Sequence, residues 1–474
     1  MKTSTTLAVA ASLLLAVEGL AVEQRQNGPK VVGMETVRIP ARNPVHRDKL
    51  RRRGTVEVGL DNEETLYFIN ATVGTPARSV RLHIDTGSSD LWVNTPSSSL
   101  CRESSRPCQF AGTYSANSSS TYEYIGSWFN ISYVDGSGAS GDYVSDTVSF
   151  GSSKLDRLQF GIGYNSTNAQ GILGIGYPIN EVQVGRAGKQ PYRNLPAQMV
   201  ADGMIQSNAY SLWLNDLDAN TGNILFGGID NAKFNPPLLS VPIQPEQGFF
   251  AEFLITLTGA TLSGTSVASD SEMALAVLLD TGSSLTYLPD DMVSTIYNRV
   301  GAQYDSSNGA AYVPCSLANE ATTFTFSFSE PTITVDMNEM VLDMYLNNGK
   351  RPQFQDGTTA CLFGIAPAGQ GTNVLGDTFL RSAYVVYDLA NNEISLAQTK
   401  FNTTASEVVE IGTGTNSVPG ATKVSNPVAA TEGISGPGVL NGIGRNAAGG
   451  RIRGGGSSAV GLVVAVGVAV GLML

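Results

Sequence analysis

Hydrophobic and polar residues follow patterns along this chain that predict short β-strands. Residues 80–84 read Val-Arg-Leu-His-Ile, an alternation typical of a strand with one buried face. Residues 274–279 read Ala-Leu-Ala-Val-Leu-Leu, an unbroken apolar run that suits a strand buried on both faces. Many Gly, Ser and Thr residues separate such runs, and they favour strands and turns over long helices. The pattern predicts a mainly β protein.

Both of these predicted strands end at the same five residues. Asp-Thr-Gly-Ser-Ser stands at residues 85–89 and again at residues 280–284. The similarity continues downstream, where Gly-Ile-Leu-Gly-Ile-Gly at residues 171–176 follows the first copy at about the same spacing as Asn-Val-Leu-Gly-Asp at residues 373–377 follows the second. A duplicated half-domain accounts for these four segments together. It offers two carboxylates, Asp85 and Asp280, at two equivalent strand ends.

A pair of carboxyl groups held in contact has a specific chemistry. Like charges a few Å apart repel, so the two groups hold one shared proton over a broad acidic range. The ionised group can then take a proton from a water molecule while the protonated group polarises a substrate carbonyl. The glycine at the third position, Gly87 or Gly282, permits a sharp turn and a close approach. The hydroxyls can donate to the carboxylates or brace the two loops, and they belong to Thr86, Ser88, Thr281 and Ser283.

At these residues the sequence resembles the pepsin-like aspartic proteases, over roughly residues 55–398. The resemblance includes both Asp-Thr-Gly loops, Leu-Trp-Val at residues 91–93, Tyr-Val-Asp-Gly-Ser at residues 133–137 and Tyr-Val-Val-Tyr-Asp at residues 384–388. It implies a mainly β, bilobal pepsin-like fold, with the active-site cleft between two lobes related by a pseudo-twofold axis. It also implies that the chain hydrolyses peptides with an activated water molecule, without a cofactor or a metal.

The resemblance also implies roles for individual residues. Asp85 and Asp280 would form the catalytic dyad, supported by Thr86, Gly87, Ser88, Thr281, Gly282 and Ser283. Tyr133, Val134 and Asp135 would belong to a flap over the substrate, with the Tyr133 hydroxyl hydrogen-bonded to Trp92. Val134 and Asp135 stand where pepsins usually carry smaller, neutral residues.

Other functions fit the sequence less well. A single Asp-Thr-Gly would more often be a simple turn, but two copies in matching contexts reverse that interpretation. Only two histidines occur, His46 and His83, so Ser-His-Asp catalysis and a His/Cys metal cluster have almost nothing to use. The Gly-rich segments lack the full spacing of phosphate-binding loops. A glycosidase would also need two carboxylates, but no sugar-binding aromatic platform is evident. A catalytically silent binding or wall protein on the same fold remains the alternative.

The first 53 residues precede the predicted enzyme. Residues 1–21 carry a lysine, an apolar stretch and small residues, the pattern of a secretory signal peptide. Residues 22–53 are basic towards their end and are interpreted as a propeptide that covers the cleft of an acidic enzyme. The Arg-Arg-Arg at residues 51–53 is a candidate processing site. We expect the N-terminal lobe at residues 54–245 and the C-terminal lobe at residues 246–400.

The cysteines and sequons favour a secreted protein. Four cysteines allow three disulfide connectivities, and the simplest pairs Cys101 with Cys108 and Cys315 with Cys361, within each lobe. Asn-X-Ser/Thr sequons predict N-glycosylation, although each alone is a weak signal, and they lie at Asn70, Asn117, Asn130, Asn165 and Asn402.

The C-terminal part has the composition of a stalk and an anchor signal. Residues 401–446 are rich in Ser, Thr and Gly and are predicted to form a disordered stalk. Residues 459–474 are apolar but short for a bilayer span, and no basic residue follows them. Small residues near Asn446 precede this tail, which matches a glycosylphosphatidylinositol (GPI) attachment signal over residues 447–474, with a tail-end membrane helix as the alternative.

Together these features resemble the yapsin group of fungal proteases, which are GPI-anchored and cleave beside basic residues. The whole chain has a formal net charge of -12 and its leader is basic, so the enzyme itself is more acidic still. Such a surface would attract cationic substrates, although it could equally serve solubility. We expect a monomer with polypeptide substrates and no nucleic-acid partner, on the extracellular face of the plasma membrane or in the cell wall.

Overall fold

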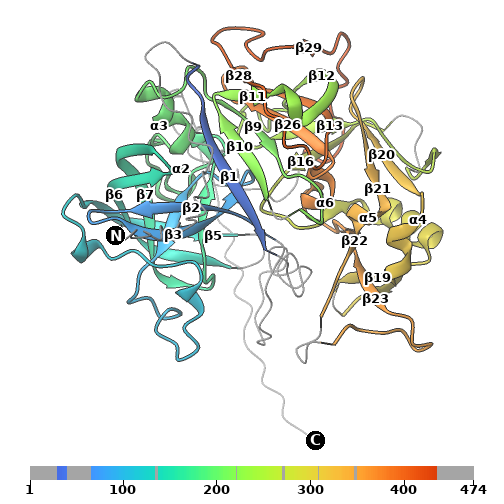
Figure 1. Cartoon of the computed structure of the whole chain (residues 1–474), viewed down its shortest axis with the longest axis horizontal. Helices are drawn as coiled ribbons and strands as arrows, with labels where there is room; N and C mark the ends of the chain where they lie inside the picture. Colours follow the sequence, from blue (N-terminus) through green and yellow to red (C-terminus); the bar gives the residue numbers. More distant parts are fainter. Residues whose placement is uncertain are drawn as a thin grey trace, which may run out of the picture.

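The chain folds into two lobes of β-strands with a shared set of strands between them (Figure 1). The structure is a computed structural model, and it describes residues 29–39, 66–133, 137–219, 221–268, 273–307, 309–345 and 350–434. Residues 66–174 supply the strands of the lobe on the left of Figure 1, and residues 254–375 supply those of the lobe on the right. The mainly β, two-lobed fold that the sequence predicts is confirmed.

Within the described ranges, one 14-stranded sheet runs from the left lobe into the region between the lobes. Its left-lobe part has the order β2 (Leu66–Val73), β3 (Arg78–Asp85), β8 (Gly171–Gly174), β4 (Leu91–Asn94), β7 (Ser153–Ser166), β6 (Gly138–Phe150) and β5 (Glu123–Ser132). Its central part has the order β29 (Ala421–Lys423), β12 (Phe234–Pro242), β27 (Glu393–Thr399), β26 (Ala383–Asp388), β9 (Ala209–Trp213), β10 (Thr221–Phe226) and β1 (Val32–Ile39).

The right lobe is built from three smaller sheets. The first has the order β13 (Leu254–Leu257), β16 (Leu275–Leu279), β25 (Val374–Leu375), β17 (Thr286–Leu288) and β24 (Ile365–Pro367). The second has the order β15 (Thr265–Ser266), β14 (Gly259–Leu262), β20 (Thr323–Ser327) and β21 (Thr332–Asp336). The third has the order β18 (Gln303–Asp305), β19 (Ala310–Pro314), β23 (Ala360–Phe363) and β22 (Val341–Leu342).

Helices are short in the described part of the chain. They are α2 (Val182–Ala187), α3 (Leu195–Ala201), α4 (Asp290–Val300), α5 (Met337–Met340) and α6 (Asp377–Leu380). Single 3₁₀ turns lie at η1 (Pro107–Gln109), η2 (Ala116–Ser118), η3 (Pro178–Asn180), η4 (Asn231–Lys233) and η5 (Cys315–Asn319). Helix α4 has acidic residues in its first turn and ends at Gly301, whose φ of 67° is the left-handed conformation that favours glycine.

The two lobes repeat one arrangement around the duplicated loops. In the left lobe β3 runs parallel to β8, with Asp85 opposite Gly174. In the right lobe β16 runs parallel to β25, with Leu279 opposite Leu375. The main hydrophobic core extends through both lobes and includes the apolar residues directly before each Asp-Thr-Gly loop. Each loop is therefore mounted on the buried end of a packed strand.

Strand β1 lies inside the segment predicted as a propeptide. It pairs antiparallel with β10, from Val32 opposite Phe226 to Val37 opposite Thr221, and it also pairs with β2. Thr36 on this strand is fully buried. Residues 29–39 are thus part of the central sheet, while the basic residues after Arg38 and the candidate processing site lie outside the described residues.

The predicted stalk does not begin at residue 401, which corrects the sequence interpretation. Strand β28 (Val408–Glu410) pairs with β11 (Gly228–Asp230), and β29 pairs in parallel with β12. The segment buries Ile411, Val418 and Val424, with 0%, 7% and 6% of their surfaces exposed. A few apolar residues are thus enough to hold this segment on the body, because they pack against sheets formed by other parts of the chain. The folded body extends to residue 434 at least.

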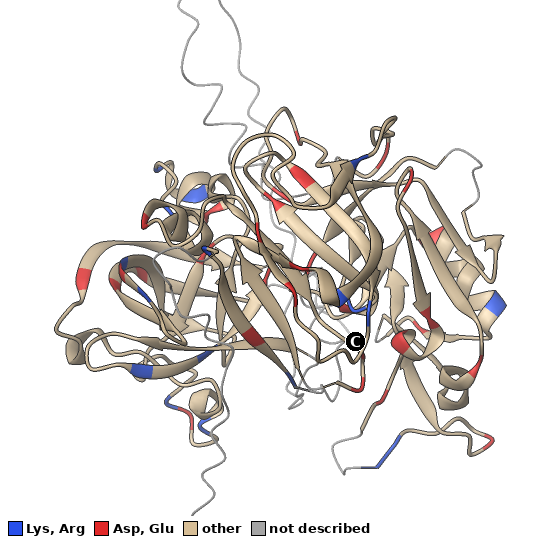
Figure 2. Ribbon diagram, turned by 45° about the horizontal axis from the view of Figure 1, so that its top comes forward, with Lys and Arg blue, Asp and Glu red and all other residues tan. Residues whose placement is uncertain are grey.

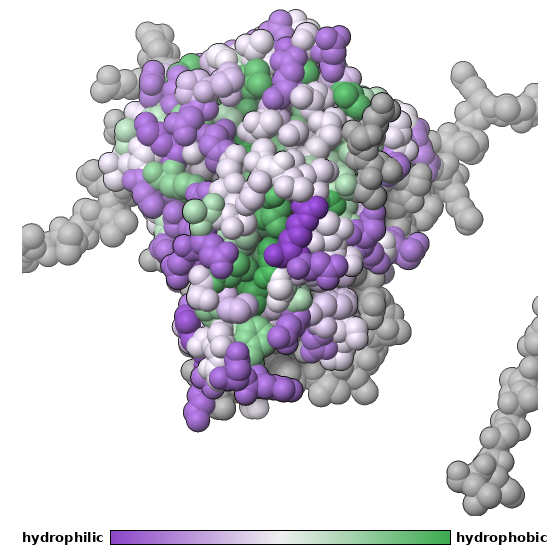
Figure 3. Space-filling view, turned by 90° about the vertical axis from the view of Figure 1, so that its right-hand side faces the viewer, coloured by the Kyte–Doolittle hydropathy of each residue, from purple (hydrophilic) through white to green (hydrophobic). Residues whose placement is uncertain are grey.

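Charged and apolar residues are spread over the surface of both lobes. Acidic residues outnumber basic ones, 41 to 29, and both kinds are scattered along the ribbon (Figure 2). On the face of the right lobe, hydrophobic side chains form a narrow band between hydrophilic ones (Figure 3). Over the described ranges, no helix combines the length and the hydrophobicity needed to cross a membrane. The apolar tail at residues 459–474 lies outside those ranges.

Candidate active site

The two Asp-Thr-Gly loops meet between the lobes and are tied together by their threonines. The Thr86 hydroxyl donates to the carbonyl oxygen of Leu279 at 2.9 Å, and the Thr281 hydroxyl donates to that of Ile84 at 3.0 Å. Each hydroxyl also accepts from the backbone N–H of the other threonine, at 3.0 and 3.1 Å. Both threonines are buried, so these hydrogen bonds are protected from water. They fix the position of one loop against the other.

Asp85 and Asp280 have matching hydrogen-bond partners within their own loops. Ser88 Oγ donates to Asp85 Oδ2 at 2.6 Å, and Ser283 Oγ donates to Asp280 Oδ2 at 2.7 Å. The Gly87 N–H donates to Asp85 Oδ1 at 2.9 Å, as the Gly282 N–H does to Asp280 Oδ1 at 2.7 Å. The exposed fractions are 1% for Asp85 and 6% for Asp280. The two carboxylates are therefore held in one orientation each.

One glycine N–H joins the two carboxylates. Besides its bond to Asp85, the Gly87 N–H donates to Asp280 Oδ1 at 3.1 Å. A Cβ atom built on Gly87 would lie 2.6 Å from that same oxygen. No side chain larger than hydrogen fits there without moving Asp280. Glycine is thus required at the third position of the first loop, because the Asp280 carboxylate approaches Gly87 closely.

The Gly-rich segments after each loop pack directly against the loops. A Cβ on Gly174 would lie 2.5 Å from the Ser89–Asp90 backbone, at the N atom of Asp90. A Cβ on Gly376 would lie 2.3 Å from the carbonyl oxygens of Ser283 and Leu285. The equivalent glycines of the two lobes therefore allow equivalent contacts, which explains why the duplication extends beyond the Asp-Thr-Gly residues.

The flap predicted around Tyr133 is a β-hairpin formed by β5 and β6. Ser132 pairs with Gly138, and the Tyr133 N–H donates to the Ser137 carbonyl at 2.8 Å. The Trp92 indole N–H donates to the Tyr133 hydroxyl at 2.7 Å, the hydrogen bond that the sequence resemblance implied. Val134 and Asp135 lie outside the described residues.

A buried group of acidic and aromatic residues lies against the flap strand β6, and no sequence motif pointed to it. Asp90 accepts hydrogen bonds from the hydroxyls of Tyr143, at 2.5 Å, and Tyr192, at 3.0 Å, and from the Val182 N–H at 2.8 Å. Burial and the nearby Asp90 raise the pKa of Glu181 to about 10. Glu181 is therefore neutral at physiological pH. This group connects the loop after Asp85 to the flap strand β6, which carries Tyr143.

His83 is a second residue that sequence reasoning did not assign. It is fully buried on β3, and its Nε2 lies 3.3 Å from the Thr281 carbonyl oxygen of the opposite loop. Its position two residues before Asp85 is the signal that could have drawn attention to it. The other histidine, His46, lies outside the described residues.

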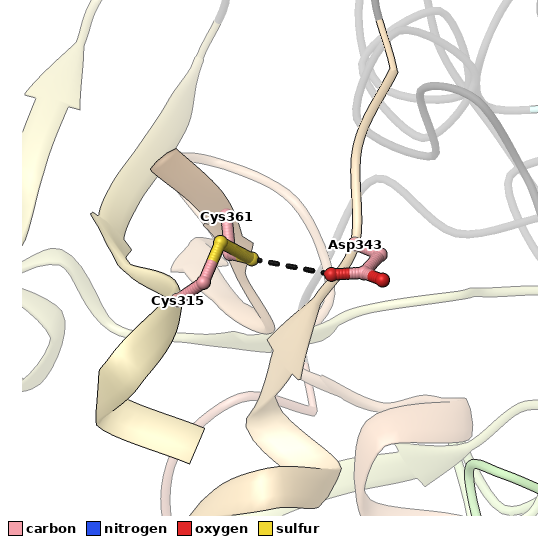
Figure 4. A group of neighbouring side chains, drawn as sticks. All are labelled: Cys315, Asp343 and Cys361. Atoms are coloured by element: carbon pink, nitrogen blue, oxygen red, sulfur yellow. Dashed lines mark hydrogen bonds between the residues drawn. A yellow bond between two sulfur atoms is a disulfide. The ribbon is translucent and has the colours of Figure 1, made fainter. Parts of the chain in front are cut away.

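Both predicted disulfides are present. Cys101 is bonded to Cys108, and Cys315 is bonded to Cys361. Among the described residues, the group closest to a metal-ligand set is Cys315, Cys361 and Asp343, with Asp343 Oδ1 3.4 Å from the Cys361 sulfur (Figure 4). The two sulfurs are bonded to each other, so they offer no thiolates to a metal. Asp343 also forms an ion pair with Arg351.

The predicted glycosylation sites are accessible. All of the sequon asparagines have exposed side chains, at Asn70, Asn117, Asn130, Asn165 and Asn402. Asn130 lies on the flap strand β5, where its carbonyl oxygen accepts a hydrogen bond from Arg186 at 2.9 Å. The candidate GPI attachment residue, Asn446, lies outside the described residues.

Comparisons with known proteins agree on one family. The family model described as eukaryotic aspartyl protease matches residues 66–399. A probable aspartic-type endopeptidase opsB of Aspergillus oryzae is 56% identical over 410 residues, covering 85% of this chain and 83% of that protein. Candidapepsin-3 of Candida albicans is 37% identical over 369 residues, covering 76% and 86%. The crystal structure of an aspartic proteinase from Irpex lacteus matches with a TM-score of 0.59 at 22% identity, covering 79% and 100%, and shares the fold.

Proposed function

The chain belongs to the eukaryotic aspartyl protease family and is an aspartic-type endopeptidase, and on that premise we propose that Asp85 and Asp280 are its catalytic dyad. The main support for this assignment is a shared hydrogen-bond donor. The backbone N of Gly87 lies 2.9 Å from Oδ1 of Asp85 and 3.1 Å from Oδ1 of Asp280. One donor reaches both oxygens only if they converge on one point. Such convergence is what shared-proton chemistry requires.

In the proposed reaction, the dyad activates a water molecule that lies against both carboxyl groups. The ionised carboxylate takes a proton from this water, and the water oxygen attacks the peptide carbonyl carbon. At the same time the protonated carboxyl donates its proton to the carbonyl oxygen. A tetrahedral diol forms. The carboxyl that took the water's proton then gives it to the amide nitrogen, the C–N bond breaks, and the diol returns its second proton to the other carboxylate. Ser88 and Ser283 hold the outer oxygens in place throughout.

This assignment is tested by replacing each aspartate with an amide. Asp85→Asn and Asp280→Asn should each lower peptide hydrolysis by at least about a thousandfold, because an amide cannot complete the proton exchange. Cleavage of a peptide is measured by mass spectrometry at acid pH, with Asp202→Asn as a control that removes an exposed carboxylate on the end of α3. A folded Asp85→Asn or Asp280→Asn variant that kept a tenth of the wild-type rate would contradict the assignment.

The alternative of a catalytically silent surface protein has no support among these residues. It would be favoured by loss of either aspartate or of Tyr133, and all three are present. Relatives at 50–56% identity over most of the chain carry the name of aspartic-type endopeptidase.

We also propose that the enzyme is secreted as a propeptide-bearing precursor, is N-glycosylated and stays attached to the cell surface by a GPI anchor. The support comes from the leader at residues 1–21, the basic segment ending at residues 51–53, the exposed sequons and the apolar tail at residues 459–474. The two disulfides are consistent with folding in an oxidising compartment.

For the substrate, we propose polypeptides with a basic residue beside the scissile bond, as in the processing of proproteins or cell-surface proteins. The net charge of -12 for the whole chain supports attraction of cationic segments. The sequence offers Asp135 on the flap as a partner for a lysine or arginine. Its carboxylate lies outside the described residues, and the proposal for Asp135 rests on its place in the flap sequence.

A further inference from the structure

A third acidic side chain, Glu252, lies within the electrostatic influence of Asp280. Strand β13 pairs antiparallel with β16, with Leu254 opposite Leu278. One residue further, the Leu279 N–H donates to the Phe253 carbonyl at 3.2 Å. Strand β13 begins at Leu254 and β16 ends at Leu279, and continuing their register past these ends places Glu252 across from Asp280. Residues directly opposite each other in an antiparallel pair project to the same face, with Cβ atoms about 4.5–5.5 Å apart.

A fourth carboxylate, Glu246, reaches the same place from a tight turn. The Gln244 N–H donates to the Leu254 carbonyl at 2.7 Å, and Glu246 and Phe249 exchange backbone hydrogen bonds at 2.8 and 2.9 Å. This turn folds back onto the start of β13. The exposed fractions are only 7% for Glu246 and 9% for Glu252. Oε2 of Glu246 is buried and has no hydrogen-bond partner among the described residues.

Within the described part of the chain, neither glutamate has a basic group among the charges that act on it. Burial, then Glu246 and then Asp280, raise the pKa of Glu252 to about 8. Burial also raises the pKa of Glu246. The charged groups that act on Glu252 from the elements packed against it are thus both acidic. Burying a carboxylate without a cationic or hydrogen-bonding partner lowers the stability of the fold. Two such carboxylates beside the proposed active site therefore suggest that a ligand supplies the partner.

The ligand that matches this site is a cation delivered beside the dyad. We infer that Glu252, supported by Glu246, binds the cationic side chain of a substrate lysine or arginine close to the scissile bond. The inference rests on the proposed function, since a peptide bound across Asp85 and Asp280 brings its flanking side chains to the neighbours of Asp280. An ammonium or guanidinium group would give Glu246 Oε2 the partner that it lacks among the described residues and would pair with the Glu252 carboxylate.

The binding of a cation has a defined dependence on pH. Glu252 must be ionised to pair with lysine, and in the free enzyme its pKa is about 8. A bound cation favours the ionised form and lowers this pKa, so binding of lysine should release a proton at pH 6. Preference for lysine should increase as the pH rises from about 4 towards 8, unlike a preference set by an exposed carboxylate, which would be complete above about pH 5.

The experiment compares matched peptides that carry Lys or the uncharged norleucine at each position flanking the scissile bond. The ratio of kcat/KM for Lys over norleucine should be about ten- to a hundredfold in the wild type at pH 7. It should fall by about tenfold or more in Glu252→Gln and less in Glu246→Gln. Glu252→Asp, which keeps the charge, should retain part of the ratio. Asp202→Asn should not change it.

A second readout does not depend on turnover. Binding of statine-type peptides to the Asp85→Asn protein is measured by calorimetry in buffers of different ionisation enthalpy. We expect the Lys peptide to release a proton on binding. This proton release should be absent when the protein also carries Glu252→Gln. Equal Lys-to-norleucine ratios in the wild type and Glu252→Gln would overturn the inference. So would a loss of the preference in Asp135→Asn with none in Glu252→Gln. A wild type that cleaves peptides without favouring Lys would remove the basic-specificity proposal and this inference with it, and a wild type that cleaves no peptide would contradict the peptidase assignment itself.

Discussion

At the scale of single residues, position in the fold gives carboxylic side chains different chemistry. Asp85 and Asp280 receive two short hydrogen bonds each from their own loops. For Glu252, whose charge is disfavoured by that of Asp280, no hydrogen bond of this kind is found among the described residues. The first two carboxylates are stabilised by donors. The pKa of the third is raised to about 8 because burial and two acidic neighbours disfavour its charge.

The raised pKa of Glu252 predicts how stability depends on pH. Its folded-state pKa of about 8 exceeds the ordinary value of 4.5, so the folded state holds a proton that the unfolded state releases. The cost to stability is absent below about pH 4.5, grows by at most about 1.4 kcal/mol per pH unit above it, and is constant above about pH 8. Glu252→Gln should therefore raise the free energy of unfolding at pH 7 and leave it unchanged at pH 4.

This prediction is checked by urea unfolding at both pH values. Both proteins carry Asp85→Asn, which prevents autolysis. A Glu252→Gln variant whose stability gain was the same at pH 4 and pH 7 would mean that a change in packing, and not ionisation of the carboxyl, is responsible.

At the scale of elements, the chain beyond residue 400 completes the body of the enzyme. Strand β29 extends the central sheet beside β12. Further on, the Ala276 N–H of β16 donates to the Glu432 carbonyl at 2.8 Å, so the segment reaches the strand that ends at Asp280. These contacts connect the C-terminal segment both to the strands between the lobes and to the strand that directly precedes Asp280, a proposed catalytic residue.

Truncation should separate the structural part of this segment from the rest. A chain ending at residue 434 should keep the melting temperature and activity of the longer protein. A chain ending at residue 400 loses Ile411, Val418 and Val424, and burial of each such side chain contributes about 1.5–3 kcal/mol. We expect it to melt well below the longer protein, or to be recovered unfolded, in a thermal scan. Equal melting temperatures for the two would show that the segment is dispensable.

At the scale of the whole molecule, the two lobes form one unit around the proposed dyad. The threonine hydrogen bonds cross between the lobes, and one hydrophobic core extends through both. Buried Arg381 on the C-terminal side of α6 forms an ion pair with buried Glu339 of α5. A further 40 residues, numbered 435–474, include the proposed anchor signal and lie outside the described residues.

The proposed anchor predicts how the whole molecule is held at the cell surface. Phosphatidylinositol-specific phospholipase C should release the protein from isolated membranes, because a lipid on a GPI anchor is the only attachment proposed. A chain truncated before Ala459 should be secreted in soluble, active form. Release is followed by immunoblotting of the soluble and membrane fractions. Detection of Leu474 by mass spectrometry in the mature protein would rule out removal of the tail and therefore the anchor.

The sequence by itself determined the chemistry and the general architecture. Two Asp-Thr-Gly-Ser-Ser copies, each after an apolar run, predicted a duplicated β fold that offers two carboxylates at equivalent strand ends. These predictions depend on local patterns: the apolar runs end where the loops begin, and the loops have the same residues because they make the same contacts. Pairing of cysteines within each predicted lobe was the simplest of the three connectivities, and both pairs are present.

Only the tertiary structure decided which distant residues share the site. Glu252 is 28 positions from Asp280 in the numbering, and the pairing of β13 with β16 brings the segments that adjoin these two residues together. Similarly, Gly87 is required because Asp280, from the other lobe, comes within 3.1 Å of its N–H. The polar segment after residue 400 was predicted as a stalk because its composition lacks a core of its own. Its few apolar residues become buried on sheets made by other parts of the chain, and composition carries no information about such long-range contacts.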